Sequence, residues 1–436
     1  MKNMSAKMLQ EIDQLAPQLS TWRRDFHRHA EAAWTEFRTS AQIAKRLTEW
    51  GYELQLGDKI IASNSMMGVP DKADLERHMH RAVAQGADPQ LVDAMRGGLT
   101  GVVATLTTGR PGPTIALRFD IDSNDAQEVG DPGHRPAREG FASINAGAMH
   151  ACGHDGHAAI GLGLAKILID HRDELSGTIK LIFQPAEEGV RGAKAMVDRG
   201  VVDEVDYLLS GHIGFGAGMP GSIVCGTSGF LATSKFDAMF RGQSAHAGAA
   251  PDEGRNALLA AATAALNLHA IPRHKSGASR INVGVLNAGI GRNLIAPTAL
   301  MKIETRGANS AINDYMVARA EAVLRSTAGM YDCDLDIMFM GSAPSAESDV
   351  ELQEVVKTVA EQLIPVELIV AETALGGSED VSFMMKRVQE QGGKAVYVMV
   401  GTQLAAGHHD QRFDFDESCL PLAVKLFAGT AFALTR

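Results

Sequence analysis

The chain has 436 residues and a mass of 46.4 kDa, which is long for one domain and indicates two or three. Apolar residues make up 45% and charged residues 21%, so the composition is that of a globular protein and excludes a disordered or fibrous one. The net charge of −11 argues against a nucleic-acid-binding protein, whose binding domain is normally basic.

The sequence contains no pattern of an export signal or a membrane span. The N-terminal segment lacks the apolar core of a secretory signal, and no stretch approaches the roughly 18 apolar residues that a transmembrane helix needs. The four cysteines, Cys152, Cys225, Cys333 and Cys419, are far apart, which argues against a disulfide framework. We therefore expect a soluble, cytoplasmic protein.

In chain order, helices come first and strands follow. Apolar residues recur at helical spacing over residues 9–19 and 39–50, and the second run ends at Gly51, a residue type that favours helix ends. Residues 102–105 and 114–121 have the composition of strands and flank a turn rich in Gly and Pro. These elements are expected to open an α/β domain.

A polar segment, residues 62–98, lies between these helices and strands, and we interpret it as an insertion or flap on the first domain. One face of its own predicted helix carries the apolar residues Leu75, Met79 and Val83. The pair Asp88-Pro89 has the residue types expected at the N-cap and first turn of a second helix.

Residues 227–341 have a different pattern from the chain around them. Strands are predicted near residues 236–240, 281–285, 301–305 and 333–339, and helices near 255–270 and 311–328. The side chains expected to face inward include Leu258, Ala262 and Leu266 of the first helix and Cys333, Leu335, Ile337 and Phe339 of the last strand. The resulting order, βαββαβ, is that of a ferredoxin-like domain.

Strands and helices alternate in the rest of the chain. Helices are expected near residues 158–169, 193–199 and 350–363, and strands near 178–183 and 206–209. This alternation predicts an α/β domain with a largely parallel sheet. We therefore expect residues 1–226 and 342–436 to form one α/β domain, into which residues 227–341 are inserted.

The most informative segment is the run MHACGHDGH at residues 149–157. A thiolate from Cys152 and an imidazole from His154 can reach the same metal ion, because Gly153 between them permits a tight turn. The other histidines, His150 and His157, are expected to be structural or to support the ligands. The alternative is a His-rich loop whose side chains cap a helix.

Other possible ligands stand at the ends of predicted strands. Glu187 and Glu188 follow the strand that ends near residue 183, and adjacent acids can divide their roles, one binding metal and one holding a proton. Further candidates end other strands: Asp120, Asp122, His212 and His409. A glutamate pair can simply open a helix, and a lone histidine at a strand end is ordinarily structural. Four strand ends that each offer Cys, His or Glu together favour a metal site.

At these residues the chain resembles the M20 metallopeptidase superfamily, and within it the amidohydrolase branch that cleaves N-acyl and N-aryl amino acids. The matching motifs are RFDID at 118–122, MHACGHDGH at 149–157, IFQPAEEG at 182–189, GQSAHAG at 242–248, GSED at 377–380 and HHDQRFDFDE at 408–417. They run in family order over most of the chain. The resemblance implies a zinc-exopeptidase-like catalytic α/β domain with the ferredoxin-like domain inserted as a dimerisation or lid domain.

The resemblance also implies a site for two divalent metal ions. Carried over by motif position, the ligands are Cys152, His154, Glu188, His212 and His409. Glu187 is implied as the general base, with Asp120 as a second catalytic carboxylate, and Arg118 stands where the wider superfamily has a metal-binding His. Thiolate and imidazole favour zinc by softness, whereas carboxylates and water favour manganese. Because related enzymes are often assayed with manganese, manganese is expected first and zinc as the alternative.

On the substrate side, His246 resembles the family histidine that reaches across a dimer and would donate to the oxyanion or a carboxylate. Asn293 and Arg306 are expected to hold the free carboxylate of the amino-acid product, since guanidinium binds carboxylate bidentately. Residues 123–125, Ser-Asn-Asp, replace the branch's Ala-Leu-Pro and indicate a different substrate pocket. We expect hydrolysis of an N-aryl or N-acyl glutamate by a homodimer or a heteromer with a homologous B subunit.

Three alternatives remain open. The chain could be a deacylase of another N-acyl amino acid or of a short peptide. Cys152 could be a nucleophile with a nearby His as base, in which case a chelator would spare the activity. Finally, the chain could be a non-catalytic partner subunit, although the presence of every proposed ligand and of Glu187 weighs against that.

Overall fold

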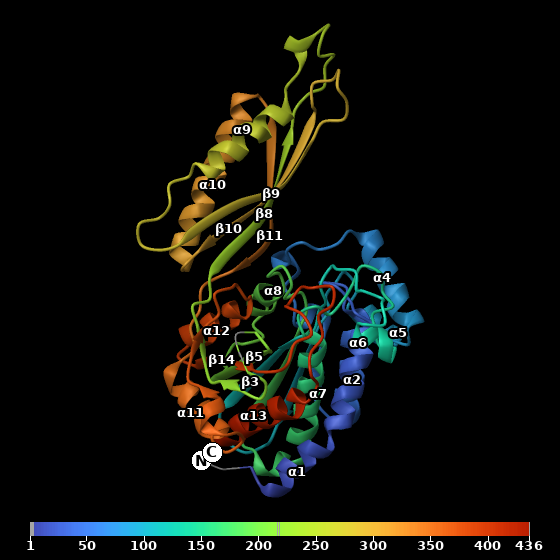
Figure 1. Ribbon diagram of the computed structural model, residues 1–436, viewed down its shortest axis with the longest axis vertical. Helices are drawn as coiled ribbons and strands as arrows, with labels where there is room; N and C mark the ends of the chain where they lie inside the picture. Colours follow the sequence, from blue (N-terminus) through green and yellow to red (C-terminus); the bar gives the residue numbers. More distant parts are fainter. Residues whose placement is uncertain (1–3, 216, 218, 436) are drawn as a thin grey trace. The chain divides into compact units, whose positions relative to one another are not determined.

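Figure 1 shows the computed structural model of the chain, which describes residues 4–215, 217 and 219–435. The chain divides into two compact units. Unit 1 comprises Met1–Ser228, Ala346–Leu375 and Asp380–Arg436, and unit 2 comprises Gly229–Ser345 and the short segment Gly376–Glu379. No sequence pattern indicates that this last segment groups with unit 2.

Unit 1 is built on an eight-stranded mixed sheet. The strands lie in the order β1 (Glu53–Gln55), β2 (Val102–Thr107), β4 (Thr178–Gln184), β3 (Thr114–Asp120), β5 (Tyr207–Ile213), β14 (Lys394–Val400), β6 (Ile223–Val224) and β12 (Ile369–Val370). The central strands β4, β3, β5 and β14 are parallel. Because β1 with β2, β2 with β4, and β14 with β6 pair antiparallel, the expected parallel arrangement is right for the centre and wrong at these three pairings.

The helices of unit 1 pack around this sheet. They are α1 (Ala6–Gln14), α2 (Ala16–Arg28), α3 (Phe37–Trp50), α4 (Lys72–Ala84), α5 (Pro89–Ala94), α6 (Arg135–Glu139), α7 (His154–Asp170), α8 (Ala193–Asp198), α11 (Val350–Ala360), α12 (Val381–Glu390) and α13 (Cys419–Leu434). Helix α7 contacts α2, α13 and the strands β3, β4 and β5, and Figure 1 shows it beside α2 and α13. Among the described residues, no helix is both long and apolar enough to cross a membrane.

Two glycines let α7 lie between the sheet and the outer helices. A Cβ atom at Gly161 would come within 3 Å of Phe119 and Phe183 on the sheet, and one at Gly163 would collide with Leu19 of α2. A glycine inside a helix lowers helix stability by about 1 kcal/mol relative to alanine. The close packing that these glycines allow offsets that loss. The helix that carries His154 is therefore fixed on both sides.

Two expected boundaries near the metal motif are wrong. Helix α7 begins at His154 instead of near residue 158, because Gly153 adopts a left-handed conformation (φ 92°) and turns the chain directly into the helix. Strand β5 continues to Ile213 instead of ending near residue 209, since its pairing with β14 runs to that residue. His212 consequently lies inside a strand.

The insertion packs its helices against α3. Its small core joins Phe37 and Ala41 of α3 to the residues Leu75, Met79, Ala82, Ala87, Val92 and Met95. The predicted face of α4 is partly wrong, because Ala82 is buried and Val83 is 39% exposed. Asp88 accepts a hydrogen bond from the backbone N–H of Gln90 (2.8 Å) and caps α5, as the Asp-Pro pair predicts.

Unit 2 has the predicted βαββαβ order. Its elements are β8 (Ala232–Arg241), α9 (Ala257–His269), β9 (Ser279–Ala288), β10 (Thr298–Gly307), α10 (Ser310–Met330) and β11 (Asp334–Ala343). The strands lie in the order β11-β8-β10-β9 with antiparallel pairing throughout. Together with the α/β architecture of unit 1, this confirms the predicted fold class.

The predicted buried face of α9 is wrong. Leu258 and Leu266 are 38% and 77% exposed, whereas Ala257, Ala260, Ala261, Ala264 and Leu268 are buried. Small alanine side chains let α9 approach α10 and the sheet closely, so the alanines and not the leucines form the packed face. Phe339 is also 39% exposed, because the pairing of β11 with β8 shifts register directly after it.

Candidate metal centre

The candidate ligands meet at one edge of the sheet in unit 1. The adjacent parallel strands β3, β4, β5 and β14 all end there, and the carboxyl edge of such a sheet is where ligands usually bind. Cys152 and His154 reach the same edge from the start of α7. All five expected metal ligands come from these elements or from the loops that follow them.

The ligand atoms form two groups that share one thiol. Cys152, His154 and His212 make one group, and Cys152, Glu188 and His409 make the other, with the ligand atoms of each group within 4.8 Å of one another. The Sγ atom of Cys152 lies 3.4 Å from Nε2 of His212, and Nε2 of His409 lies 3.5 Å from Oε1 of Glu188. The sequence-predicted ligand set is thus brought together in space.

Hydrogen bonds on the far side of two rings orient them toward the centre. Nδ1 of His154 donates to the carbonyl of Asp122 (3.0 Å), and Nδ1 of His212 donates to the carbonyl of Ile213 (2.8 Å). Each ring therefore keeps its Nε2 lone pair for the centre, which is the usual arrangement of histidine ligands.

Two ligand atoms are buried without a hydrogen bond among the described residues, Nε2 of His154 and Oε1 of Glu188. Leaving a buried polar atom unpaired costs about 1–3 kcal/mol. A cation bound by these atoms would remove that cost. Thiolate, imidazole and carboxylate are also the donor types that transition metals accept, so the residues fit a metal ion.

Acidic neighbours make the centre favourable for positive charge, and they raise the pKa values of nearby groups. Polar contacts with Cys152 and Glu188 raise the pKa of His409 to about 10. Burial opposes protonation of His154, but the charge of Asp120 and neighbouring polar contacts raise its pKa well above the usual range. Burial and the charge of Glu188 raise the pKa of the Cys152 thiol. A nucleophilic cysteine needs a lowered pKa, so this upward shift weighs against that alternative.

The turn that carries the glutamate pair is held by two buried carboxylates. The carboxylate of Asp122 accepts the backbone N–H groups of Glu187 (3.0 Å) and Glu188 (2.8 Å). Glu36 accepts the N–H of Ala186 (2.8 Å), which has a positive φ of 55°. Strained backbone of this kind persists where the surroundings fix it, and it is frequent at functional sites.

This turn gives the two glutamates different positions. Glu188 lies toward His409, and although burial opposes its ionisation, His409 and Asn124 lower its pKa. Oε2 of Glu187 instead lies 3.9 Å from Nε2 of His154. The sequence indicates Asp122 as an orienting acid but does not single out Glu36 or Asn124. The replaced Ser-Asn-Asp loop is the only signal for Asn124, and the sequence holds none for Glu36.

Asp120 is tied to its neighbours in a fully buried network. One of its oxygens accepts from Arg118 (2.6 Å) and the other from Nδ1 of His157. Nε2 of His157 in turn accepts the backbone N–H of Ile213 (3.0 Å). These contacts suit a residue that positions the centre, and His157 supports the ligands as expected.

His409 has an unusual backbone for its residue type. Its φ of 67° lies in the left-handed region, and its N–H donates to the carbonyl of Ala151 (2.7 Å). This hydrogen bond fixes the loop after β14 beside the start of α7. The side chain is 61% exposed, so of the five candidate ligands it is the one most open to solvent.

The three expected substrate-binding residues lie in unit 2. Nδ1 of the exposed His246 accepts two backbone N–H groups, which leaves Nε2–H as a donor. Asn293 is beside His246, because its carbonyl accepts the N–H of Ala247 (3.0 Å). Arg306 is near the far end of β10, opposite Thr233, and contacts Glu304 (3.1 Å). The structure therefore brings His246 and Asn293 together but not Arg306.

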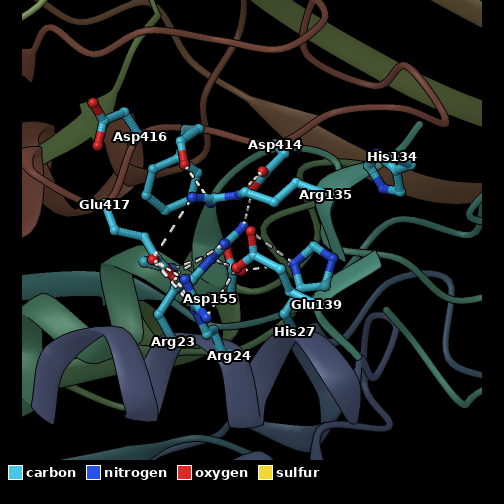
Figure 2. Close-up of polar contacts among 12 residues, drawn as sticks. Arg23, Arg24, His27, His134, Arg135, Glu139, Asp155, Asp414, Asp416 and Glu417 are labelled. Atoms are coloured by element: carbon cyan, nitrogen blue, oxygen red, sulfur yellow. Dashed lines mark hydrogen bonds and ion pairs between the residues drawn. The ribbon is translucent and has the colours of Figure 1, made fainter. Parts of the chain in front are cut away.

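A buried ion network lies directly behind the first turn of α7 (Figure 2). Arg23, which has no exposed surface, contacts Asp155 (2.7 Å), Asp414 (2.8 Å) and Glu417 (3.3 Å). His27 also contacts Asp155 (2.8 Å), the residue that follows His154. Its acids lie within the motifs at 149–157 and 408–417, but the sequence does not indicate that they pair with Arg23. The network joins α2, α7 and the C-terminal segment.

Comparison with known proteins identifies relatives over nearly the full length. The chain is 53% identical to a subunit of the p-aminobenzoyl-glutamate hydrolase of Escherichia coli K12, over 97% of each chain. Residues 62–98, 291–293 and 401–409 favour that likeness from the sequence, and it is confirmed. The chain is also 51% identical to the indole-3-acetyl-aspartic acid hydrolase of Enterobacter agglomerans, over 96% of each chain.

Solved structures agree with these relatives. The aminobenzoyl-glutamate utilization protein of Klebsiella pneumoniae superposes with a TM-score of 0.83 at 44% identity, over 97% of each chain. The Bacillus subtilis YXEP protein, described as a dinuclear metal-binding M20 peptidase, superposes with a TM-score of 0.66 at 25% identity, over 97% of this chain and 99% of the other. Residues 116–433 match the description "Peptidase family M20/M25/M40". The chain therefore belongs to peptidase family M20/M25/M40 and is an amide-bond hydrolase.

Proposed function

We propose that the chain hydrolyses p-aminobenzoyl-glutamate to p-aminobenzoate and glutamate, using two divalent metal ions. The observation that carries this proposal is the 53% identity, over 97% of both chains, to the Escherichia coli protein named for that reaction. The convergence of the five candidate ligands and Glu187 at one sheet edge supports it.

A second candidate substrate is indole-3-acetyl-aspartate, because the relative named for its hydrolysis is 51% identical. The two substrates share their chemistry. Each joins an aromatic acyl group through an amide bond to an acidic amino acid. We therefore propose this class for the chain, with the glutamate conjugate first, and deacylation of another N-acyl amino acid as the remaining alternative.

The proposed ligands are Cys152, His154, Glu188, His212 and His409. Two cations held there would lower the pKa of a water molecule and polarise the scissile carbonyl. Glu187 would accept a proton from that water and return it to the nitrogen of the departing amino acid, so that water is added across the C–N bond. Asp120 would hold His157, which packs against His212.

We propose manganese as the working metal, with zinc as the alternative. The imidazoles and the thiol are borderline or soft ligands and suit zinc, whereas the carboxylates and water suit manganese. Metal analysis of protein purified without added metal, followed by reconstitution with each ion, would rank the two.

The assembly is proposed to be a homodimer or a heteromer with a homologous chain. The Escherichia coli relative is named as one subunit of its hydrolase. In the sheet of unit 2, as far as the described residues show, β9 and β11 are the end strands, each paired along one side. Either edge could pair with a second copy or a related chain.

The test is a release assay on purified protein with p-aminobenzoyl-glutamate, indole-3-acetyl-aspartate and N-acetyl-glutamate. We expect the first to be cleaved best and a chelator to abolish turnover. Glu187→Gln should keep the metal and lose about 10²–10⁴-fold in kcat, as is typical on losing a general base. Unchanged turnover in this variant would remove Glu187 from the mechanism, and no cleavage of any aromatic conjugate would reject the proposed function.

A further inference from the structure

Two arginines near the turn that carries Glu187 and Glu188, here called the catalytic turn, have guanidinium nitrogens without hydrogen-bond partners among the described residues. These atoms are Nε and Nη2 of Arg81 and Nε of Arg191, and all three are shielded from solvent. Burying charged donors without acceptors is costly, and arginine heads are rarely left so. An anion that reached these side chains would supply the missing acceptors.

Arg191 extends from the same turn as the glutamate pair. It stands three residues after Glu188, and its Nη1 donates to the carbonyl of Gly68 in the insertion (3.3 Å). The next residue, Gly192, donates its N–H to the buried Asp380 (2.9 Å), which fixes the backbone at this point. The side chain of Arg191 therefore joins the catalytic turn to the insertion.

Arg81 approaches the same region from helix α4 of the insertion. Its Nη2 lies 3.5 Å from Oε1 of Glu31, which is too long for a hydrogen bond. The carbonyl of Glu31 accepts the N–H of Ser123 (2.8 Å), and Oδ1 of the following residue, Asn124, accepts the N–H of Ala151 (3.1 Å), which adjoins Cys152. Only this short run of contacts separates Arg81 from the metal centre.

Glu31 forms an ion pair with Arg81 but accepts no hydrogen bond from it. Its two carboxylate oxygens already accept the backbone N–H groups of Arg38 (3.1 Å) and Thr39 (2.8 Å). Burial also raises the pKa of Glu31. Other buried polar atoms without a hydrogen bond belong to the insertion and the Ser-Asn-Asp loop: Nδ1 of His78, Oε1 of Gln85 and Oγ of Ser123. The insertion and the loop beside it thus hold several buried polar atoms without a hydrogen bond among the described residues.

We propose that Arg81 and Arg191 bind the side-chain carboxylate of the acidic amino acid in the substrate. This inference rests on the proposed function, and it concerns a different carboxylate from the α-carboxylate that the sequence assigns to Asn293 and Arg306. The second carboxylate is present in both the glutamate and the aspartate conjugate and is absent from neutral conjugates. Guanidinium groups bind carboxylate bidentately, which suits nitrogens that lack partners here. The insertion is therefore a specificity element.

The test compares p-aminobenzoyl-glutamate with p-aminobenzoyl-glutamine, which has nearly the same shape but no side-chain charge. The natural chain should prefer the glutamate conjugate in kcat/KM by on the order of 10²–10⁴-fold, because the neutral amide leaves the arginines unpaired. In Arg81→Met and Arg191→Met this preference should fall at least about tenfold, through a higher KM for the glutamate conjugate. Their kcat/KM for the glutamine conjugate should change little.

Arg77→Met is the matched control, because Arg77 lies one turn before Arg81 on α4, is exposed and contacts Asp74. Its preference should equal that of the natural chain. The preference is a ratio measured on one preparation, so it does not depend on the fraction of folded or metal-loaded protein. If a Met variant has no measurable activity, the ratio in Arg81→Lys or Arg191→Lys decides. It should fall by about threefold or more, because lysine cannot bind carboxylate bidentately, and a ratio equal to that of Arg77→Met would reject the subsite.

The outcomes separate this inference from the proposed function. If the natural chain cleaves both conjugates equally well, the carboxylate subsite is rejected while the hydrolase function stands. If it cleaves neither, the proposed function itself fails. If the arginine variants lose activity toward both conjugates by the same factor, Arg81 and Arg191 are structural and the subsite is rejected.

Discussion

Cys152 is shared by the two groups that together contain the five candidate ligands, so the loss of its single sulfur should disturb both groups. Two of its neighbours, His154 and His409, approach it from different elements. We predict that Cys152→Ala lowers the metal content at saturating metal without unfolding unit 1. Metal analysis after gel filtration, with circular dichroism as the check on folding, measures this.

Alkylation provides a second prediction for the same residue. A thiolate that binds metal has its lone pairs engaged, so iodoacetamide should modify Cys152 more slowly in the metal-loaded than in the metal-free chain. Cys333 is only partly buried and belongs to unit 2, and it serves as the internal control with one rate in both forms. Equal rates for Cys152 in the two forms would show that its sulfur is not a ligand.

The sequence predicts which candidate ligands converge, but not the groups that hold them. Cys152 and His212 are residue types that commonly bind metals, and they stand near the ends of secondary-structure elements. The order of the strands in the sheet brings such ends together. Glu36 and Asn124 act through hydrogen bonds to residues far away in the chain. Because both are common polar residue types, the sequence does not reveal such long-range contacts. Their roles follow only from the fold.

At the scale of elements, the first turn of α7 depends on Arg23. This side chain has no exposed surface and faces three acidic partners on two other segments. We predict that Arg23→Met lowers the free energy of unfolding by about 3–5 kcal/mol, because it removes the fully buried positive charge that lies among three acidic side chains. Urea denaturation measures the change.

Arg24 is the matched control for this prediction. It is adjacent in α2, is 35% exposed and contacts Glu417 (2.7 Å) at the edge of the same network. Arg24→Met should cost only about 0–1 kcal/mol, as exposed ion pairs usually do. If the two variants lost the same free energy of unfolding, burial of Arg23 would not explain its contribution to stability.

The same network predicts how stability depends on pH. Burial opposes ionisation of Asp155 and Asp414, but the charge of Arg23 holds both pKa values below the usual range. A lowered pKa in the folded chain contributes stability that is full above about pH 4 and is lost as the pH falls through the folded values. In Arg23→Met these pKa values rise toward their unfolded values, so the free energy of unfolding should fall less steeply below about pH 4 than in the natural chain. A curve parallel to that of the natural chain would contradict this.

His27 acts in the opposite direction. Burial opposes its protonation, but hydrogen bonds to Asp155 and Glu128 raise its pKa. A raised pKa contributes stability that is full below about pH 6.5 and is lost as the pH rises through the folded value. The contributions of the acids and of His27 are therefore both present between about pH 4 and 6.5.

Two expected helices differ from the observed ones because the spacing of apolar residues is an incomplete guide to a helix. The apolar spacing of α9 predicts that Leu258 and Leu266 face inward, yet alanines form the packed face. Periodicity gives the orientation of a helix only when large and small apolar residues are not interleaved around it. The start of α7 is misplaced for a related reason, since a histidine and an aspartate open a helix that is otherwise apolar.

At the scale of the whole molecule, the positions of Asn293 and Arg306 bear on assembly. Within unit 2 they flank opposite ends of β10, whose residues Thr298 and Arg306 are separated by about 26 Å at a normal strand rise. Two such residues of one chain cannot hold the same carboxylate. Their joint role therefore requires two copies, and the exposed Leu258, Leu266 and Ile290 of unit 2 give a second copy apolar surface to contact.

A shared site predicts recovery of activity from two inactive chains. If His246 of one copy serves the centre of the other, Glu187→Gln and His246→Ala should each be impaired alone. A mixed dimer would contain one centre with Glu187 intact and His246 supplied by the other chain. After random exchange of equal amounts, half of the dimers are mixed and each has one complete centre, so about a quarter of the natural activity should return.

The measurement needs proof that the chains exchange, which differently tagged chains and co-purification supply. The control is Glu187→Gln mixed with the double variant Glu187→Gln, His246→Ala, in which no centre has an intact base and no activity should return. If verified mixed dimers stay inactive, His246 works within its own chain or not at all. The joint assignment of Asn293 and Arg306 would then lose support as well. These residues cannot meet within one chain, so their joint role depends on the same sharing of a site between two copies.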